Sequence, residues 1–215
     1  MPITVRLVTE SDELLAIHRQ RYAVYVEELN YPQKWADHAA RTVVEPLDAT
    51  GHILGAFDDD GGLLGSVRLN YGAESDFGEY VELYGMKQFG PYFPTRLVLT
   101  TKMILDPRHR GATLMLRLCQ ASFLHTKECF PETAFSLIDS KQPLDGYFRR
   151  LGFRPTGPMI QHPAAGSVVP MAFLFDDGEY LRQIGSPLKK LYSDVGEAES
   201  VRWYQTAFGQ HLVAA

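Results

Sequence analysis

The segment from residue 96 to residue 139 constrains the fold most, because two apolar runs in it flank a periodic stretch. The runs are RLVLTTKMIL (96–105) and TAFSLID (133–139), and GATLMLRLCQASFLHTKECF (111–130) repeats its apolar residues at helical spacing. A short apolar run bounded by turn residues is typical of a strand buried in a sheet. The segment therefore predicts a strand–helix–strand unit, and with it an α/β fold.

The N-terminal residues predict another strand and helix. ITVRLV (3–8) alternates apolar and polar residues like a strand, and residues 12–29 carry apolar side chains near helical spacing. Thr9 or Ser11 is the expected N-terminal cap, because a hydroxyl oxygen can accept from the free N–H groups of a first helical turn.

A long connection precedes a predicted hairpin. Residues 52–71 predict two strands that turn at 58–62, which leaves a loop over 30–51. Loops of more than about 12 residues inside compact domains are usually functional or disordered. The aromatic residues Tyr31 and Trp35 and the carboxylates in this loop favour function.

The second half of the chain is predicted to complete a sheet flanked by helices. Residues 79–89 predict a short amphipathic helix, and residues 142–153 predict a helix that stops at Gly152. SVVPMAFLF (167–175) predicts a last strand, in which Pro170 indicates a sheet edge or a bulge.

Length and composition are consistent with one folded domain. The chain has 215 residues and 45% hydrophobic residues, which suffices for one buried core. We expect this domain to span residues 1–178, with a helical extension over 179–215 packed on it.

Charge and cysteine content exclude several classes of protein. The net charge of −5 argues against broad nucleic-acid binding, which needs many clustered basic residues. No run reaches the ~20 apolar residues that span a bilayer, and the N-terminus lacks the apolar core of a signal peptide. Cys119 and Cys129 fall on one predicted helix, ten residues apart, so they cannot form a disulfide if the helix is continuous. A cytoplasmic location is expected.

The turn between the strand at 96–105 and the following helix is basic and contains a glycine. Backbone N–H groups and the positive end of the helix dipole point outward there, and Gly111 would let a ligand approach the backbone closely. Phosphate is the natural ligand for such a turn. A solvated basic turn that binds nothing is the alternative.

Two arginines lie where a charge needs a partner. Arg68 falls inside an apolar strand, so it is expected either in a buried ion pair or on a substrate carboxylate. Arg21 lies on the first predicted helix and can pair with Glu45 or Asp48, which would tie the long loop to the body.

The order of predicted elements and two motifs resemble the Gcn5-related N-acetyltransferase superfamily. Arg108, Gly111 and Thr113 fall on the family pattern R/Q-x-x-G-x-G/A, which holds the pyrophosphate of an acyl-coenzyme A. YFRRLGF (147–153) is similar to the family signature Y-x-x-x-G-F, with Phe148 in the tyrosine position. The resemblance implies a mixed, mostly antiparallel sheet flanked by helices.

The front half is similar to two branches of that superfamily, the autoinducer synthases and the long-chain N-acyl amino acid synthases. The similarity lies in RYAVYVEELNY (21–31), EPLD (45–48) and GLLGSVRL (62–69). Lys102 stands where autoinducer synthases have the arginine of E-L-S-R, and Leu99 replaces the glutamate of that motif.

The resemblance implies roles for three sets of residues. The catalytic set is Glu45, Asp48, Arg68 and Lys102. The set that binds the acyl donor is Ile104, Arg108, His109, Arg110, Gly111, Ala112 and Thr113. The set that binds the acceptor is Arg21, Tyr25, Tyr31 and Trp35.

The expected activity is transfer of a medium or long acyl chain to a small primary amine, preferably an amino acid. The donor would be an acyl-coenzyme A or an acyl carrier protein. A carrier brings one phosphate instead of a diphosphate, which suits the β-branched Thr113 at a position where the family has Gly or Ala.

Two alternatives remain open from the sequence. One is an acyl-homoserine lactone synthase that uses S-adenosylmethionine. The other is a non-catalytic acyl-thioester sensor, in which Phe148 and Thr113 would mark a decayed site. The seven histidines form no spaced ligand set, so no metal is expected.

Overall fold

The computed structural model describes residues 2–192 and 198–211, and the chain forms two compact units. The first unit comprises Met1–Asn70 and Thr100–Phe130, and the second comprises Tyr71–Leu99 and Pro131–Ala215. Each unit is described by itself below.

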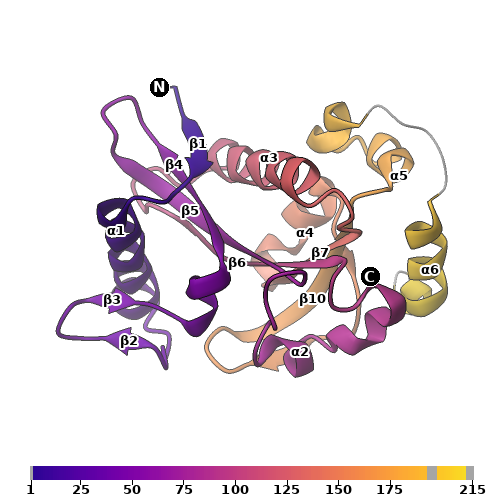
Figure 1. Ribbon diagram of the computed structural model, residues 1–215, viewed down its shortest axis with the longest axis horizontal. Coiled ribbons are helices and arrows are strands. Elements are labelled where there is room, and N and C mark those ends of the chain that lie inside the picture. Colours follow the sequence, from indigo (N-terminus) through magenta and orange to yellow (C-terminus); the bar gives the residue numbers. More distant parts are fainter. Residues whose placement is uncertain (1, 193–197, 212–215) are drawn as a thin grey trace. The chain divides into compact units, whose positions relative to one another are not determined.

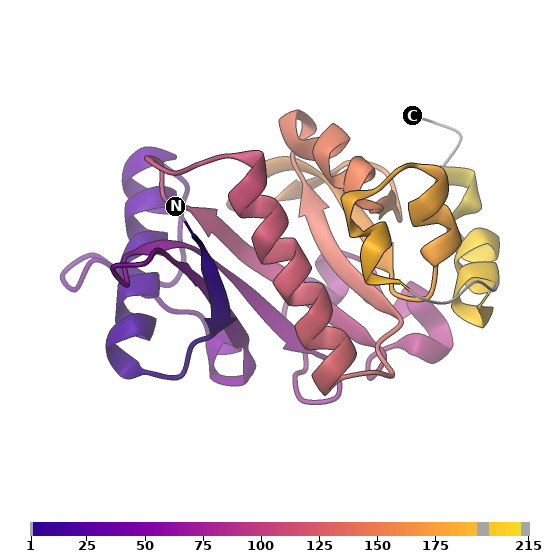
Figure 2. The same ribbon diagram turned by 90° about the horizontal axis from the view of Figure 1, so that it is seen from above.

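The first unit is built on antiparallel strands, which Figure 1 labels. Strand β4 (His52–Phe57) pairs with β1 (Thr4–Leu7) and with β5 (Leu63–Tyr71), as the predicted hairpin requires. Helix α3 (Ala112–Cys129) packs against β1 and β4 (Figure 2). A hydrophobic core cluster of this unit contains Val8, Ile17, Ile53 and Phe57.

The predicted helix over residues 12–29 consists of two parts. Helix α1 (Ser11–Tyr22) continues as the π-helical segment η1 (Ala23–Glu28), which carries one extra residue per turn. The expected cap by Thr9 or Ser11 is wrong. Glu10 is the N-cap residue, and it makes no side-chain hydrogen bond to the first turn.

The region predicted as a loop over residues 30–51 contains regular structure. Strands β2 (Ala36–Asp37) and β3 (Thr42–Val43) form a small hairpin, and Pro46–Thr50 is the 3-10 helix η2. Val43 and Leu47 are buried and anchor the region to the body of the unit. These elements are too short to leave a periodic pattern in the sequence.

Strand β6 (Leu97–Leu105) belongs to both units, because the units divide after Leu99. Its first residues pair parallel with β7 (Phe135–Ser140), with Leu97 opposite Phe135. Helix α3 follows β6 in the chain and precedes β7, so the predicted strand–helix–strand unit is confirmed.

The second unit extends this sheet. Strand β10 (Gly166–Leu174) pairs antiparallel with β7, β8 (Arg154–Pro155) and β9 (Ile160–His162). Pro170 lies in an unbroken register opposite Asp139 of β7. On the other side of β10, the pairing with β9 ends at Val168 and the pairing with β8 begins at Met171, so Pro170 falls at an interruption of that ladder, where an N–H is not needed.

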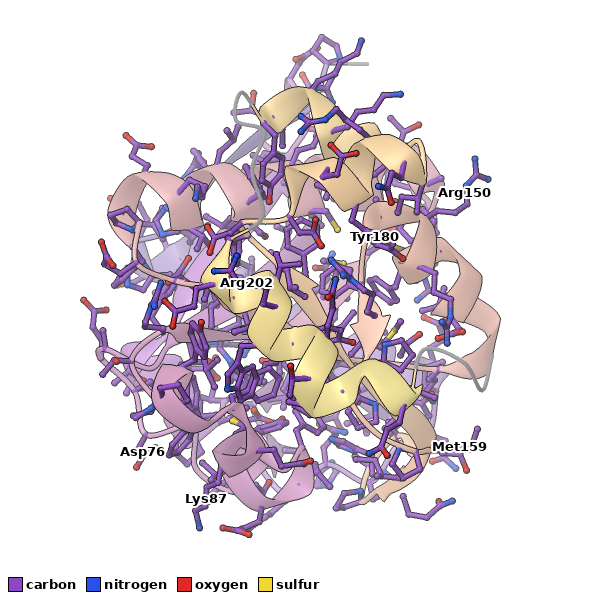
Figure 3. All side chains as sticks on the ribbon, turned by 90° about the vertical axis from the view of Figure 1, so that its right-hand side faces the viewer. Asp76, Lys87, Arg150, Met159, Tyr180 and Arg202 are labelled. Carbon is purple, nitrogen blue, oxygen red and sulfur yellow. The ribbon has the colours of Figure 1, made fainter. Side chains whose placement is uncertain are left out.

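Short helices surround the strands of the second unit. The predicted helix over 79–89 is broken at Gly85, whose φ of +58° is left-handed. Figure 3 labels Tyr180 of helix α5 (Gly178–Gln183) and Arg202 of helix α6 (Glu199–Phe208). The helices are α2 (Tyr80–Leu83), η3 (Met86–Tyr92), α4 (Gln142–Leu151), α5 (Gly178–Gln183), η4 (Pro187–Leu191), α6 (Glu199–Phe208) and η5 (Gly209–His211).

The predicted C-terminal helices belong to the second unit. Trp203 of α6 stacks on Phe89 with ring centroids 5.9 Å apart, and the ring of Phe208 packs against Phe89 at a tilt, with centroids 5.0 Å apart. Residues 193–197 and 212–215 of the predicted extension lie outside the described residues. The domain boundary after residue 178 stays a prediction.

The strands pair in the order β1-β4-β5-β6-β7-β10-β8, with β9 on β10. The pairs of β1 with β4, β4 with β5 and β10 with its three partners are antiparallel, whereas β6 and β7 are parallel. The expected mixed, mostly antiparallel sheet with flanking helices is confirmed.

Candidate functional site

Five charged side chains of the first unit form one cluster, which we call the charge cluster: Arg21, Glu45, Asp48, Arg68 and Lys102. Arg21 Nη1 donates to both carboxylate oxygens of Asp48, at 2.8 and 2.9 Å. Arg68 donates to Asp48 at 3.0 Å and to Glu45 at 2.8 Å. The other oxygen of Glu45 lies 2.5 Å from Lys102 Nζ. Three cations thus share two carboxylates.

The sequence EPLD brings both carboxylates to one side of η2. In a 3-10 helix the side chains at positions i and i+3 lie above one another. Asp48 accepts from the N–H of Glu45 at 2.7 Å, and the Glu45 side chain accepts from the backbone at the third helical position in return. This capping box fixes both side chains before any cation binds them.

Gly51 gives the Arg68 side chain its path into the cluster. A Cβ at Gly51 would lie 2.8 Å from Cγ and Cδ of Arg68 and 2.9 Å from the carbonyl oxygen of Leu47. The Arg68 side chain is completely buried, and its Nε donates to Thr101 Oγ1 at 3.2 Å. All three nitrogens of this guanidinium therefore have protein partners. The sequence predicted that Arg68 lies either in a buried ion pair or on a substrate carboxylate, and the structure contains the buried ion pair.

Strand β6 is distorted where it meets the cluster. Lys102 has a φ of +54°, a left-handed value that is uncommon for residues other than glycine. Successive side chains of a regular strand point to opposite faces, yet Thr101 and Lys102 both contact members of the cluster. The left-handed residue therefore redirects the strand so that two consecutive side chains serve one site.

The cluster keeps its carboxylates ionised. Burial raises the pKa of Glu45, but Lys102 and Arg68 outweigh burial and hold this pKa below its ordinary value. Asp48 behaves in the same way: burial opposes its ionisation, and Arg21 and Arg68 hold its pKa low. Both side chains are consequently weak bases.

Burial acts in the other direction on the basic groups. It lowers the pKa of Lys102, against the opposing effect of Glu45. It also lowers the pKa of His18, which lies near Arg21, so His18 is neutral at pH 7.

Aromatic side chains line one side of the cluster. The ring of Tyr25, in the π-helical segment η1, lies 5.2 Å from Lys102 Nζ, and it stacks on Tyr31 at 6.4 Å with an interplanar angle of 16°. Trp35 lies on the surface instead, 41% exposed, with Lys34 Nζ 4.8 Å from its ring. Of the expected acceptor residues, Arg21 belongs to the charge cluster, Tyr25 contacts it at Lys102, and Tyr31 is connected to it through Tyr25.

The two arginines of the basic turn, residues 108–113, form ion pairs with acidic side chains. Arg108 donates from Nε and Nη2 to Asp106 at 3.1 and 2.9 Å, although its side chain is 80% exposed. The hydrogen bond from Arg108 lowers the pKa of Asp106 to about 2. Arg110 pairs with Glu28 at the end of η1 and donates to the carbonyl of Leu105 at 3.3 Å. His109 Nδ1 lies 3.7 Å from Asp106.

The end of the turn is open. Gly111 is extended, with φ 175° and ψ 162°, and a Cβ there would meet no heavy atom within 4 Å. Ala112 and Thr113 are exposed at the start of the 18-residue helix α3. Ile104, which precedes the turn in β6, is buried. The expected donor residues are therefore contiguous, and the exposed ones lie beside the N-terminus of α3.

Sequence reasoning missed several residues that shape these sites. Gly51 and Thr101 position Arg68, whereas Asp106 and Glu28 pair with the turn arginines. The dipeptide Asp106-Pro107 was the one available signal, since an aspartate beside a turn often accepts from nearby backbone N–H groups.

In the second unit, Phe148 occupies the position of the family's tyrosine. It is buried, and its ring lies 5.6 Å from Phe153 and 6.0 Å from Tyr147. These contacts are those of an aromatic core.

The described residues contain no group of three or more His, Cys, Asp or Glu side chains placed to hold a metal ion. None of their helices combines the length and apolar character needed to cross a membrane.

Comparison with known proteins gives matches in structure. No family model matches the chain, and no curated protein matches it in sequence. FeeM, an N-acyl amino acid synthase from uncultured soil microbes, superposes with a TM-score of 0.63 at 15% identity, over 89% of this chain and 100% of FeeM. BjaI, a CoA-dependent acyl-homoserine lactone synthase, gives 0.67 at 17% identity, over 94% and 98%. An acyl-CoA N-acyltransferase from Pseudomonas aeruginosa gives 0.59 at 17% identity, over 80% and 99%.

These likenesses extend over nearly the full length of each compared protein, but their identities are low, so they bear on the fold. The resemblance read from the sequence is confirmed at that level: the chain has the fold of these synthases and of this acyltransferase.

Proposed function

We propose that the protein is an N-acyltransferase that moves a medium or long acyl chain from a thioester to the amine of an amino acid. The observation that carries this proposal is the placement of two features along β6. Lys102 joins the strand to the charge cluster, and the strand ends at Leu105, just before the basic turn. One strand therefore connects an acceptor site to a donor site. The likeness to FeeM and BjaI supports acyl transfer on this fold.

The reaction needs little from acid–base groups. The free amine attacks the thioester carbonyl, the C–N bond forms, and the C–S bond breaks to release a thiolate. Because a thiol has a pKa near about 8.5, the thiolate can leave without a proton donor, which makes a phenylalanine at position 148 acceptable. Water accepts the proton that the ammonium form loses before attack and the second proton that the nitrogen loses as the amide forms. The first loss costs about 1.4 kcal/mol for each pH unit between the pKa of the amine and the ambient pH.

Orientation and charge stabilisation supply the rest. Backbone N–H groups of β6 near Ile104 would donate to the oxygen of the tetrahedral intermediate. Arg21, Arg68, Glu45 and Asp48 form a rigid frame, because each ionic group in it is held by another. Such a frame would hold the acceptor in place, and orientation of the two reactants would supply part of the rate.

The donor binds at the basic turn in this proposal. Its phosphate would replace the intramolecular partners of Arg108 and Arg110 and accept from the backbone near Gly111. An acyl-coenzyme A and an acyl carrier protein both present a phosphate. Both occur in the cytoplasm, which is the expected location.

Carrier-bound and coenzyme A donors differ in their dependence on salt. A carrier protein adds an acidic surface, so its kcat/KM should fall more steeply with salt as screening shortens to roughly 3 Å at 1 M. We expect carrier-bound chains to be used at least as well as coenzyme A thioesters. A much higher kcat/KM for coenzyme A thioesters, with the same salt dependence for both donors, would contradict this expectation. The turn would then bind the diphosphate of coenzyme A and not a carrier protein.

A screen for thiol release tests the function. Purified protein is incubated with thioesters from acetyl to hexadecanoyl, each with all amino acids and with S-adenosylmethionine. We expect release that depends on an amino acid and a chain longer than acetyl. A thioester that binds without turnover would instead identify an acyl-thioester sensor.

The second candidate is an acyl-homoserine lactone synthase. It is favoured by the likeness to BjaI, whose structure has been solved with SAM and isopentyl-CoA. Leu99, which is completely buried, replaces the glutamate of the autoinducer motif and argues against it. Thiol release that requires S-adenosylmethionine in the same screen would favour this candidate.

A further inference from the structure

The charge cluster is short of negative charge. Arg21, Arg68 and Lys102 carry three positive charges, and Glu45 and Asp48 carry two negative ones, so the cluster has a net charge of +1. The neighbouring His18 is neutral and does not change this sum. A buried excess charge is costly unless a counter-ion is supplied.

The cluster is also short of hydrogen-bond acceptors. Arg21 uses Nη1 for Asp48, whereas its Nε and Nη2 are buried and have no hydrogen-bond partner among the described residues. The deficit of acceptors and the excess of positive charge therefore agree.

Lys102 is where an anion from outside can reach the cluster. The side chains of Arg21 and Arg68 are completely buried, but that of Lys102 keeps 11% of its surface exposed. An ammonium group has three N–H donors, and the ion pair with Glu45 uses one of them. The left-handed backbone at Lys102 turns this ammonium toward the cluster and beside the Tyr25 ring.

We propose that Lys102 binds the carboxylate of the acceptor, so that the site selects amino acids against the same amines without a charge. This inference rests on the proposed acyl transfer and names the residue that recognises the acceptor carboxylate. The acceptor carboxylate would bring the net charge of the cluster to zero. Its side chain would lie along the stacked rings of Tyr25 and Tyr31, which suits a large apolar or aromatic amino acid.

Amino acids and their amides test the selection directly. The probes are L-phenylalanine, L-tyrosine and L-leucine, each paired with its amide, which has the same shape without the carboxylate charge. We expect kcat/KM with decanoyl-coenzyme A to favour at least one amino acid over its amide by roughly 10- to 100-fold, the value of a charged hydrogen bond. The amine of the amide is less basic than that of the amino acid, so a larger fraction of it is unprotonated and reactive. A preference for the amino acid would therefore arise despite this advantage of the amide.

Variants at position 102 assign the selection to Lys102. Lys102→Gln should lower the ratio of kcat/KM for the amino acid to kcat/KM for its amide by roughly 10-fold or more, while Lys102→Arg should keep most of this ratio. Lys87→Gln removes an exposed lysine of the second unit and serves as the control. Thermal melting of each variant checks that it is folded.

The outcomes separate this inference from the proposed function. Titration calorimetry of each amino acid and amide into the wild-type protein measures selection without turnover. Tighter binding of an amino acid with no thiol release would support the carboxylate site and contradict the transferase. Thiol release with equal use of amino acid and amide would keep the transferase and overturn the site. Equal binding of every pair, or equal loss of both substrates in Lys102→Gln, would also overturn it.

Discussion

The charge cluster and the basic turn both contain arginine–carboxylate pairs, but the pairs of the cluster are buried and those of the turn are exposed to solvent. In the cluster, the side chains of Arg21 and Asp48 are 0% and 7% exposed, whereas Arg108 of the turn is 80% exposed. Water screens the exposed pair, so its arginine can change partner at little cost. A buried pair cannot be broken without leaving a charge in the interior. The cluster is therefore suited to hold a shape, and the turn is suited to exchange its partner for a ligand.

Removing Arg68 should give the largest effect. Arg68→Met removes the buried bonds that link Glu45 to Asp48, and breaking such an ion pair typically costs about 3–5 kcal/mol. Urea denaturation measures the loss in the free energy of unfolding. Arg108→Met is the matched control, and its unfolding midpoint should stay that of the wild type because Arg108 is exposed. Equal destabilisation by both variants would remove the contrast between the two regions.

The fold was predictable where its pattern is local. The boundaries of β6, α3 and β7 were placed within a few residues, because an apolar run or a helical period is written in consecutive residues. Strands β8 and β9 have two and three residues, which is too short for a period to appear. Their place in the sheet depends on pairing with β10, which the sequence does not display.

The site was predictable in its members but not in its geometry. The motifs named Arg21, Glu45, Asp48 and Arg68, which the structure brings together. The left-handed conformation of Lys102 could not be read from its side chain, since lysine has no preference for it. Without that distortion, Thr101 and Lys102 would be expected on opposite faces of the strand.

Acid should weaken the cluster only below the ordinary pKa values of its two carboxylates. The pKa values of Glu45 and Asp48 are lowered from the ordinary 4.5 and 3.8, despite burial, so the folded state binds fewer protons than the unfolded state. Their stabilisation is fully present above the ordinary values and is lost as the pH falls through the lower folded values. Denaturation curves at a series of pH values should lose part of this acid dependence in Glu45→Gln, because Asp48 keeps its own contribution. A wild-type stability that does not fall below pH 4.5 would contradict the ionised cluster.

Two glycines offer a smaller and more local comparison. Gly51→Ala places a Cβ 2.8 Å from the Arg68 stem and 2.9 Å from a backbone carbonyl, so we expect a loss of about 1–3 kcal/mol. Gly111→Ala meets open space at an extended φ and should leave stability unchanged. It should weaken donor binding if the phosphate approaches this backbone closely. Chemical denaturation and donor titration on both variants measure the two effects, and a stable Gly51→Ala protein would show that Arg68 does not need this path.

The most direct test of the account asks whether the two regions serve different substrates. Titration calorimetry measures the affinities for decanoyl-coenzyme A and for L-phenylalanine, or for whichever amino acid the screen prefers, in the wild type, Arg108→Ala and Lys102→Gln. The account predicts that Arg108→Ala weakens the thioester by roughly 10-fold and leaves the amino acid unchanged, and that Lys102→Gln does the reverse. Equal weakening of both ligands in either variant would contradict the separation of donor turn and acceptor cluster.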